Sequence, residues 1–155
     1  MQRFRPWHGI VLVVVFFAVF VLADRHLDGG SRYERVAPDA AGEVRIGVDD
    51  LEVGDVRFYR FLNPSNQEVK FFVGRDENGT VQVAFDANEI CFKRKRGYEF
   101  QDDWLICRVC EKSFRLSGVN DGGGGCSPIP VAHRLEGEEL VLAEADVLEG
   151  WRLFR

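Results

Sequence analysis

Hydrophobic residues gather near the N-terminus in one uninterrupted run that has no counterpart later in the chain. Residues 9–23, GIVLVVVFFAVFVLA, include no charged side chain. With the three residues before them they give about 18 residues, which is long enough for a helix that spans a bilayer. Arg3 and Arg5 precede the run, so the positive-inside rule predicts a cytoplasmic N-terminus and places everything after Asp24 outside. The pattern predicts a single-pass protein of the cytoplasmic membrane with a periplasmic C-terminal domain.

A cleaved signal peptide is the alternative interpretation of the same run. Val21-Leu22-Ala23 weakly satisfies the requirement for small residues before a cleavage site. We favour a retained anchor over residues 1–23, because the run is long for a signal peptide and lacks the polar break that usually precedes cleavage. Residues 24–43 are rich in Gly, Asp, Arg and Ala without an apolar period, which predicts a spacer next to the membrane.

From about residue 44 the pattern changes to short apolar runs of the kind that indicate β-strands. Four such runs are EVRIGV, DVRFYRFL, EVKFFVGR and TVQVAFD. The last two flank Asp76-Glu77-Asn78-Gly79 and predict a hairpin, because Asn-Gly suits a type I′ turn, whose two central residues both have positive φ. In the second strand of this hairpin, Val81, Val83 and Phe85 share the face that we expect in the core.

The rest of the chain is less regular. Residues 88–126 are rich in glycine and charge, with Trp104-Leu105-Ile106 as their one compact apolar strand, so we expect a loop-rich knuckle without a second core. Residues 138–148 and 150–155 predict one or two closing strands, with a short helix in the first stretch as the alternative. The fold prediction is mainly β, or else α+β. It comprises one N-terminal transmembrane helix and one small β-rich extracytoplasmic domain over residues 44–155 with a cysteine-rich knuckle.

Composition and charge remove several classes of function. Hydrophobic residues make up 46% of the chain, including 13 Phe and 3 Trp, and supply a core that does not depend on disulfides. The net charge of −5 disfavours a nucleic-acid partner. No nucleophile-base-acid grouping, phosphate loop or paired-histidine motif is present, so we expect no independent catalytic activity beyond redox chemistry. The one dense basic run, Lys93-Arg94-Lys95-Arg96, is either a solvated turn or a contact for an anionic or electron-transfer partner.

The four cysteines, Cys91, Cys107, Cys110 and Cys126, follow the spacing C-x15-C-x2-C-x15-C. In one interpretation they bind zinc, iron or an iron-sulfur centre, because a C-x2-C turn lets two sulfurs meet one ion and the outer cysteines complete the site. In a second, Cys107 and Cys110 form a thiol-disulfide pair in which Arg108 lowers the thiol pKa. In a third, all four form structural disulfides, which an oxidising exterior permits. The residues favour the metal site and leave the other two open.

Several other residues are secondary candidates for the site. Gly124 and Gly125, in the glycine run before the last cysteine, are expected to bring backbone N–H groups close to sulfur and offset its negative charge. Asp86 and Glu89 precede the first cysteine and are either hard oxygen ligands for iron or turn acids. His133 is either an additional ligand or a lone exposed histidine.

Three stretches together resemble a known bacterial family. They are EVKFFVGRDENGTVQVAFDANEICF, KRGYEFQDDWLICRVCEKSF and GGGGCSPIPV. They are similar, over residues 44–155, to the membrane iron-sulfur-containing, FtrD-like proteins. The resemblance implies that all four cysteines occupy ligand positions. Asn88 stands where the family has a further cysteine, which favours a single ligand set over thiol exchange and makes Asn88 another secondary candidate.

The resemblance also implies a role in bacterial iron uptake. It suggests electron transfer or redox support beside an inner-membrane permease, with an iron-sulfur cluster or iron as cofactor and zinc as the alternative. The partners would be that permease or a redox protein of the uptake system. Two other functions stay open. One is a structural zinc- or disulfide-stapled binding domain of a membrane complex, and the other is a metallochaperone that delivers metal to a permease through Cys107 and Cys110.

Overall fold

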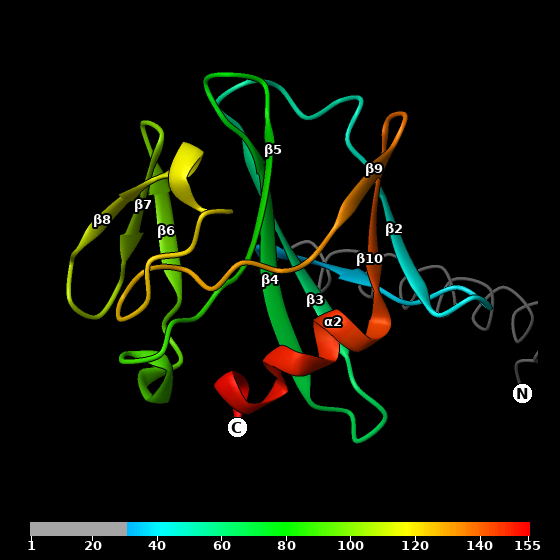
Figure 1. The fold of residues 1–155 in the computed structure, drawn as a ribbon. Helices are drawn as coiled ribbons and strands as arrows, with labels where there is room; N and C mark the ends of the chain where they lie inside the picture. The colour runs from blue at the N-terminus through cyan, green and yellow to red at the C-terminus, as the bar shows by residue number, and fades with distance from the viewer. Residues whose placement is uncertain (1–30) are drawn as a thin grey trace, which may run out of the picture. The chain divides into compact units, whose positions relative to one another are not determined.

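The computed structural model describes residues 31–155, of which Tyr33–Arg155 form one compact unit (Figure 1). The unit is mainly β, as the sequence predicts. Its strands are β1 (Tyr33–Val36), β2 (Glu43–Gly47), β3 (Val56–Leu62), β4 (Glu68–Arg75), β5 (Val81–Phe85), β6 (Tyr98–Gln101), β7 (Trp104–Cys107), β8 (Ser113–Arg115), β9 (Arg134–Glu136) and β10 (Glu139–Ala143). The helical segments are short: the α-helix α2 (Glu144–Glu149) and the 3₁₀ helices η1 (Phe92–Arg94), η2 (Leu116–Gly118) and η3 (Gly150–Phe154).

The membrane helix expected over residues 9–23 lies outside the described residues. Within residues 31–155, every helix is too short or too polar to cross a bilayer.

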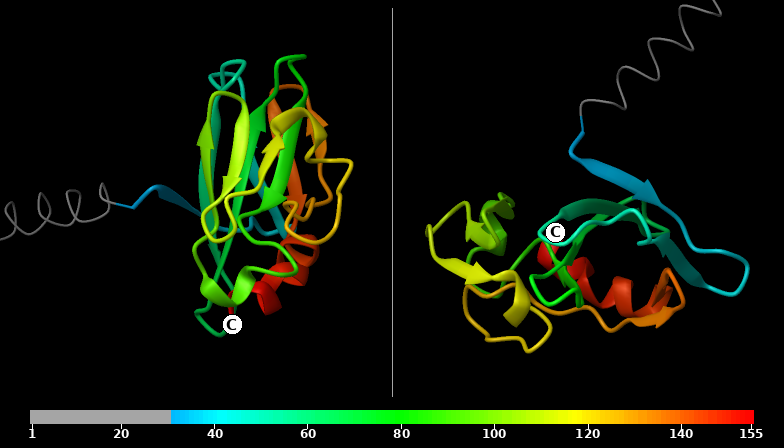
Figure 2. Two further views of the ribbon diagram at one scale, coloured as in Figure 1. Left: turned by 90° about the vertical axis from the view of Figure 1, so that its left-hand side faces the viewer. Right: turned by 90° about the horizontal axis from the view of Figure 1, so that it is seen from above.

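Two sheets pack face to face around the main core (Figure 2). The first has the strand order β1-β3-β4-β5 and the second β2-β10-β9, and all neighbours are antiparallel except β1 and β3. Successive side chains of a strand point to opposite faces, so each sheet sends alternate residues into the space between them. Among these core residues are Val44, Ile46, Phe61, Phe71, Val83, Phe85, Leu140 and Leu142. In Figure 1, α2 and η3 lie at the lower end of this core.

A third sheet, β6-β7-β8, covers the other face of β4 and β5. Its residues Tyr98 and Leu105 are fully buried in a second apolar cluster. Phe72 of β4 and Ala84 of β5 also belong to that cluster, so these two strands are buried on both faces. The expectation of a knuckle without a second core is therefore wrong, since residues 88–126 hold three strands and most of this cluster. The second cluster could not be predicted from the pattern of residues 88–126, because it also needs side chains from β4 and β5.

The hairpin of β4 and β5 forms as predicted, with Val81, Val83 and Phe85 in the main core. Its turn, however, is not of type I′. Gly79 has a φ of +79°, but Asn78 does not share the positive φ. The Asp76 carboxylate accepts hydrogen bonds from the N–H groups of Asn78 and Thr80, both at 2.9 Å, and holds the longer loop in place. Side-chain capping thus overrides the preference of the Asn-Gly pair.

Two terminal segments also differ from the predictions. Residues 150–155, predicted as a strand, form η3 instead, and Trp151, Leu153 and Phe154 pack half-buried against the main core. The stretch before it divides between β10 and α2, so the strand and the short helix are both present. β1 lies within residues 24–43, where the sequence shows only a spacer, and pairs in parallel with β3. β1 has too few apolar residues to show a period, and η3 is too short for its apolar residues to distinguish a helix from a strand.

Candidate metal centre

The four cysteines come together from three separate segments. Cys91 directly precedes η1, Cys107 ends β7, Cys110 lies in the turn between β7 and β8, and Cys126 lies in the loop before β9. After the last cysteine the chain runs alongside β5, to which backbone hydrogen bonds in both directions attach it. The loop that carries Cys126 is therefore fixed to the central sheet and not only to its neighbours in sequence.

Three of the four sulfurs converge closely. The sulfur atoms of Cys91, Cys110 and Cys126 all lie within 4.8 Å of one another, and those of Cys91 and Cys126 are 3.8 Å apart. A disulfide would need about 2.05 Å, and all four cysteines are free thiols here. No histidine nitrogen or carboxylate oxygen of residues 31–155 joins the group. A donor set of sulfur alone suits zinc or iron and disfavours hard cations such as magnesium.

Burial differs sharply among the four cysteines. Cys107 is 1% exposed and Cys126 is 9% exposed, whereas Cys110 is an exposed residue. Desolvation, followed by the neighbouring sulfurs of Cys110, Cys126 and Cys107, raises the pKa of the Cys91 thiol to about 12. A bound cation acts in the opposite direction, because cysteines bind metal as thiolates. The difference in exposure between Cys107 and Cys110 gives the site a buried side and a side that faces solvent.

Asn88 connects three parts of the site through its side-chain amide. Its Oδ1 accepts hydrogen bonds from the N–H groups of Cys91 at 2.6 Å and Ile90 at 3.1 Å. Its Nδ2 donates to Tyr98 Oη at 2.9 Å and to Cys107 Sγ at 3.6 Å. Both ends of the amide are thus engaged, and Asn88 positions two cysteines without joining the sulfur group.

Tyr98 fixes the backbone of the last cysteine. Its hydroxyl donates to the carbonyl oxygen of Cys126 at 2.5 Å and accepts from Asn88. Burial raises the pKa of Tyr98 above its usual range, so the hydroxyl stays protonated and remains a donor. The rings of Phe72 and Phe114 meet the Tyr98 ring edge-on. The role of Tyr98 is not predicted by residue type or spacing, and its only signal in the sequence is the Gly-Tyr step within the stretches that resemble the family.

Two tight turns set the remaining geometry. Gly124 and Gly125 both have a φ of +62°, and the Gly125 N–H donates to Glu89 Oε2 at 3.1 Å. That N–H was expected to approach sulfur, but it holds the loop through Glu89 instead. In the C-x2-C turn, Glu111 has a φ of +60° and its N–H donates to the carbonyl oxygen of Cys107 at 2.9 Å. The turn is closed by the backbone itself.

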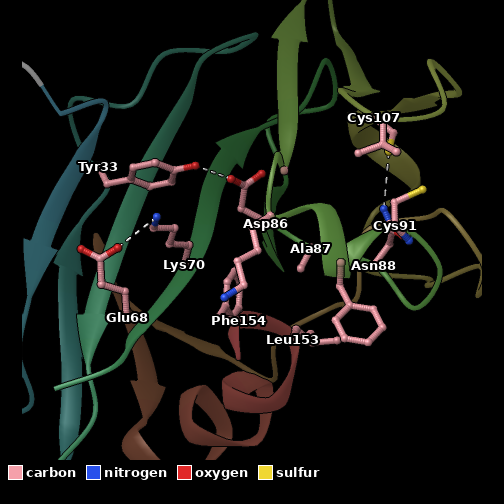
Figure 3. A pocket seen from close by; sticks show the side chains of 14 residues that line it. Tyr33, Glu68, Lys70, Asp86, Ala87, Asn88, Cys91, Cys107, Leu153 and Phe154 are labelled. Atoms are coloured by element: carbon pink, nitrogen blue, oxygen red, sulfur yellow. Dashed lines mark hydrogen bonds and ion pairs between the residues drawn. The ribbon is translucent and has the colours of Figure 1, made fainter. Parts of the chain in front are cut away.

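A pocket of about 240 Å³ lies beside the site. Figure 3 shows Cys91 and Cys107 at one end and Tyr33 and Lys70 at the other. At the far end the Tyr33 hydroxyl donates to Asp86 Oδ2 at 2.5 Å, and the Lys70 ammonium lies 4.9 Å from the centre of the Tyr33 ring. The wall between the two ends is largely apolar and includes Phe92, Val109, Leu153 and Phe154. Cys91 and Cys107 thus line one end of this pocket, although Cys107 itself is almost fully buried.

Two secondary candidates lie apart from the sulfur group. The carboxylate of Asp86 is buried and accepts hydrogen bonds from the Tyr98 N–H at 2.6 Å and from Tyr33. His133 Nδ1 lies 2.8 Å from the carbonyl oxygen of Val131. Neither side chain joins the three converging sulfurs. Asp86 instead links the strand that follows η1 to the first sheet.

Neither the curated proteins nor the solved structures gave a match. A family model described as membrane iron-sulfur containing protein FtrD-like matches residues 51–154, which is most of the chain and includes all four cysteines. The match agrees with the resemblance of the motifs around those cysteines. The chain therefore belongs to the FtrD-like family of membrane iron-sulfur containing proteins.

Proposed function

We propose that this protein is a membrane-tethered, extracytoplasmic metal-binding accessory protein that transfers electrons through thiolate-bound iron and supports iron transport. The observation that carries the proposal is the convergence of Cys91, Cys110 and Cys126, whose sulfurs come from three segments and lie within 4.8 Å of one another. Cys107 adds a fourth thiolate on the buried side. Sulfur-only donor sets of this kind hold zinc and the iron of electron-transfer proteins.

In this proposal the cysteines hold the metal and their hydrogen-bond partners keep them in place. Iron bound by thiolates supplies a one-electron redox couple whose potential depends on hydrogen bonds to sulfur and on exposure. Asn88 donates such a hydrogen bond to Cys107, while Tyr98 fixes the backbone of Cys126. Partners of this kind orient metal ligands and restrict their movement. These hydrogen bonds around the cysteines suit a metal site whose charge changes during electron transfer while its geometry stays the same.

The exposed side of the site suits contact with a redox partner. Cys110 is exposed, and Ile90, next to Cys91 in the chain, is 66% exposed. Exposed basic residues surround these positions in sequence: Lys93, Arg94, Lys95, Arg96, Arg108 and Lys112. Two exposed acids, Glu89 and Glu111, lie next to Ile90 and Cys110 in the chain, so the nearby charge is positive in excess and not of one sign. An excess of positive charge favours brief, steered encounters with a surface of opposite charge. We expect an acidic surface on the partner, which passes one electron to or from the cysteine site.

Tethering to the membrane is the second part of the proposal. It is supported by the apolar run at residues 9–23 and by the family's description as membrane proteins. A tether keeps the protein close to a permease and raises its effective concentration there. The iron permease as partner follows from the family resemblance.

Metal analysis of the full chain tests the proposal. The chain is purified in detergent without oxygen, its metals are determined, and its visible spectrum is recorded during a redox titration. We expect iron and a visible band that dithionite bleaches and reoxidation restores. A colourless protein with zinc would refute electron transfer and leave a structural site.

A metallochaperone is the other candidate, and the exposure of Cys110 favours it because an open ligand can be exchanged. Rapid, stoichiometric loss of metal to a competing chelator would support delivery. Slow exchange together with reversible redox behaviour would support electron transfer.

A further inference from the structure

The distances between the sulfurs limit how many metal atoms the site can hold. The sulfurs of Cys91 and Cys126 are 3.8 Å apart, and that of Cys110 lies within 4.8 Å of both. These positions follow from the fold of the chain, since Asn88 fixes the backbone of Cys91 and Tyr98 fixes that of Cys126. The separations can therefore be compared with what each kind of centre requires.

A single ion and a multi-iron cluster require different separations. Thiolate sulfur lies about 2.3 Å from a tetrahedral ion, so any two of its sulfurs are about 3.8 Å apart. In a cluster, inorganic sulfide bridges the irons, and cysteines bound to different irons lie farther apart than cysteines that share one. Three sulfurs that all lie within 4.8 Å leave no space for a second iron and its bridging sulfides.

We propose that the four cysteines hold one metal ion in a tetrahedral site, without inorganic sulfide. The proposal rests on the metal-binding part of the proposed function and is independent of electron transfer. An S4 tetrahedral site accepts either iron or zinc. One iron held by four thiolates is still iron bound by sulfur, so a one-ion site agrees with the family's description.

Cys107 is the fourth ligand in this site. Its sulfur accepts a hydrogen bond from Asn88 Nδ2, and the same side chain binds the N–H of Cys91 through Oδ1. One amide thus links the two cysteines, which Figure 3 shows close together at one end of the pocket. The Cys107 sulfur lies outside the group of three sulfurs that are all within 4.8 Å of one another, but it is a hydrogen-bonding neighbour of the Cys91 thiol. Binding of the ion therefore requires Cys107 to move inward from this position to become the fourth ligand.

Three measurements on the full chain, purified in detergent without oxygen, test the number of metal atoms. They are metal per chain, acid-labile sulfide per chain, and X-ray absorption at the metal edge. We expect one metal ion, no sulfide, and a single shell of sulfur neighbours at about 2.3 Å. Two or more irons with sulfide, or a short metal–metal distance, would overturn the proposal. That result would contradict the one-ion site but not electron transfer. A single ion without redox activity would contradict electron transfer but not the one-ion site.

Cobalt(II) titration of the metal-free chain gives an independent count. We expect the absorption of tetrahedral cobalt-thiolate to saturate at one equivalent, and saturation at two would overturn the proposal. Cys107→Ser should weaken cobalt binding by more than the roughly 10–100-fold that loss of an outer hydrogen-bond partner costs. His133→Ala is the matched control, because His133 lies outside the sulfur group. Unchanged binding in Cys107→Ser, or weakened binding in His133→Ala, would contradict the four-thiolate site.

Discussion

Gly97 occupies a conformation and a space that suit only glycine. Its φ is +63°, and a Cβ there would overlap the Asp86 carboxylate. Gly79 offers a matched comparison, because its φ is +79° but nothing lies within 4 Å of a Cβ. We expect Gly79→Ala to lower the free energy of unfolding by about 1–2 kcal/mol, and Gly97→Ala by roughly 1–3 kcal/mol more because of the overlap. Urea unfolding measures both, and equal losses would mean that Asp86 moves aside freely.

Removing one hydroxyl tests the polar shell of the site. Tyr98→Phe removes the hydroxyl partner of the Cys126 carbonyl and leaves Asn88 Nδ2 with only its long bond to Cys107, so the free energy of unfolding should fall by about 1–3 kcal/mol. Tyr33→Phe is the control, since Asp86 keeps its bond to the Tyr98 N–H and the loss should stay near 1 kcal/mol. Thermal or urea unfolding of the two variants measures both losses. A larger loss in Tyr33→Phe would argue against Tyr98 as the residue that fixes the backbone of Cys126.

At the residue scale, the sequence indicated the sulfur donors of the site but not the hydrogen bonds that hold them in place. Cysteine spacing identifies sulfur donors because a C-x2-C turn is a local feature. The bond between Tyr98 and Cys126 joins residues 28 positions apart, and that between Asn88 and Tyr98 joins residues 10 apart, so both depend on how the third sheet docks. The bond from the Gly125 N–H to Glu89 joins residues 36 positions apart and depends on the packing of these segments in the same way.

Strand β4 separates the two apolar clusters, and neighbouring residues on it test them independently. Phe71 lies in the main core, and Phe72 lies in the second apolar cluster together with Tyr98. Each change to alanine should cost about 3–5 kcal/mol. Only Phe72→Ala should also reduce the metal retained by folded protein, because Phe72 packs against Tyr98. Unfolding and metal analysis of both variants check this, and equal metal loss in Phe71→Ala would show that the clusters are coupled.

At the scale of elements, strands with a clear alternation were predicted and the others were not. β3, β4 and β5 combine apolar runs with clear turns, so the sequence indicated where these strands lie. The turn type could not, because one buried side chain, Asp76, decides it through two hydrogen bonds. The second core was missed because Phe72 and Tyr98 are far apart in the chain and meet only after the sheets pack.

At the scale of the molecule, charge is distributed unevenly. The chain has a net charge of −5, yet Lys93, Arg94, Lys95 and Arg96 follow the first cysteine as four consecutive exposed cations. If this local charge governs access to the iron-loaded site, ferricyanide, an anion, should oxidise it faster than a cationic oxidant such as hexaammineruthenium(III), after correction for driving force. We expect a difference of roughly tenfold, at the lower end of what steering produces. Stopped-flow oxidation of the full chain measures it.

Salt and substitutions separate this local effect from the net charge. The ferricyanide rate should fall as salt shortens the screening length from about 10 Å at 0.1 M to about 3 Å at 1 M. Lys93→Gln with Arg94→Gln should lower it several-fold. Arg35→Gln with Arg134→Gln removes the same charge from β1 and β9 and should change it little. Because both double variants have the same net charge, equal effects would mean that the total charge governs the encounter and that the basic run is only a solvated turn.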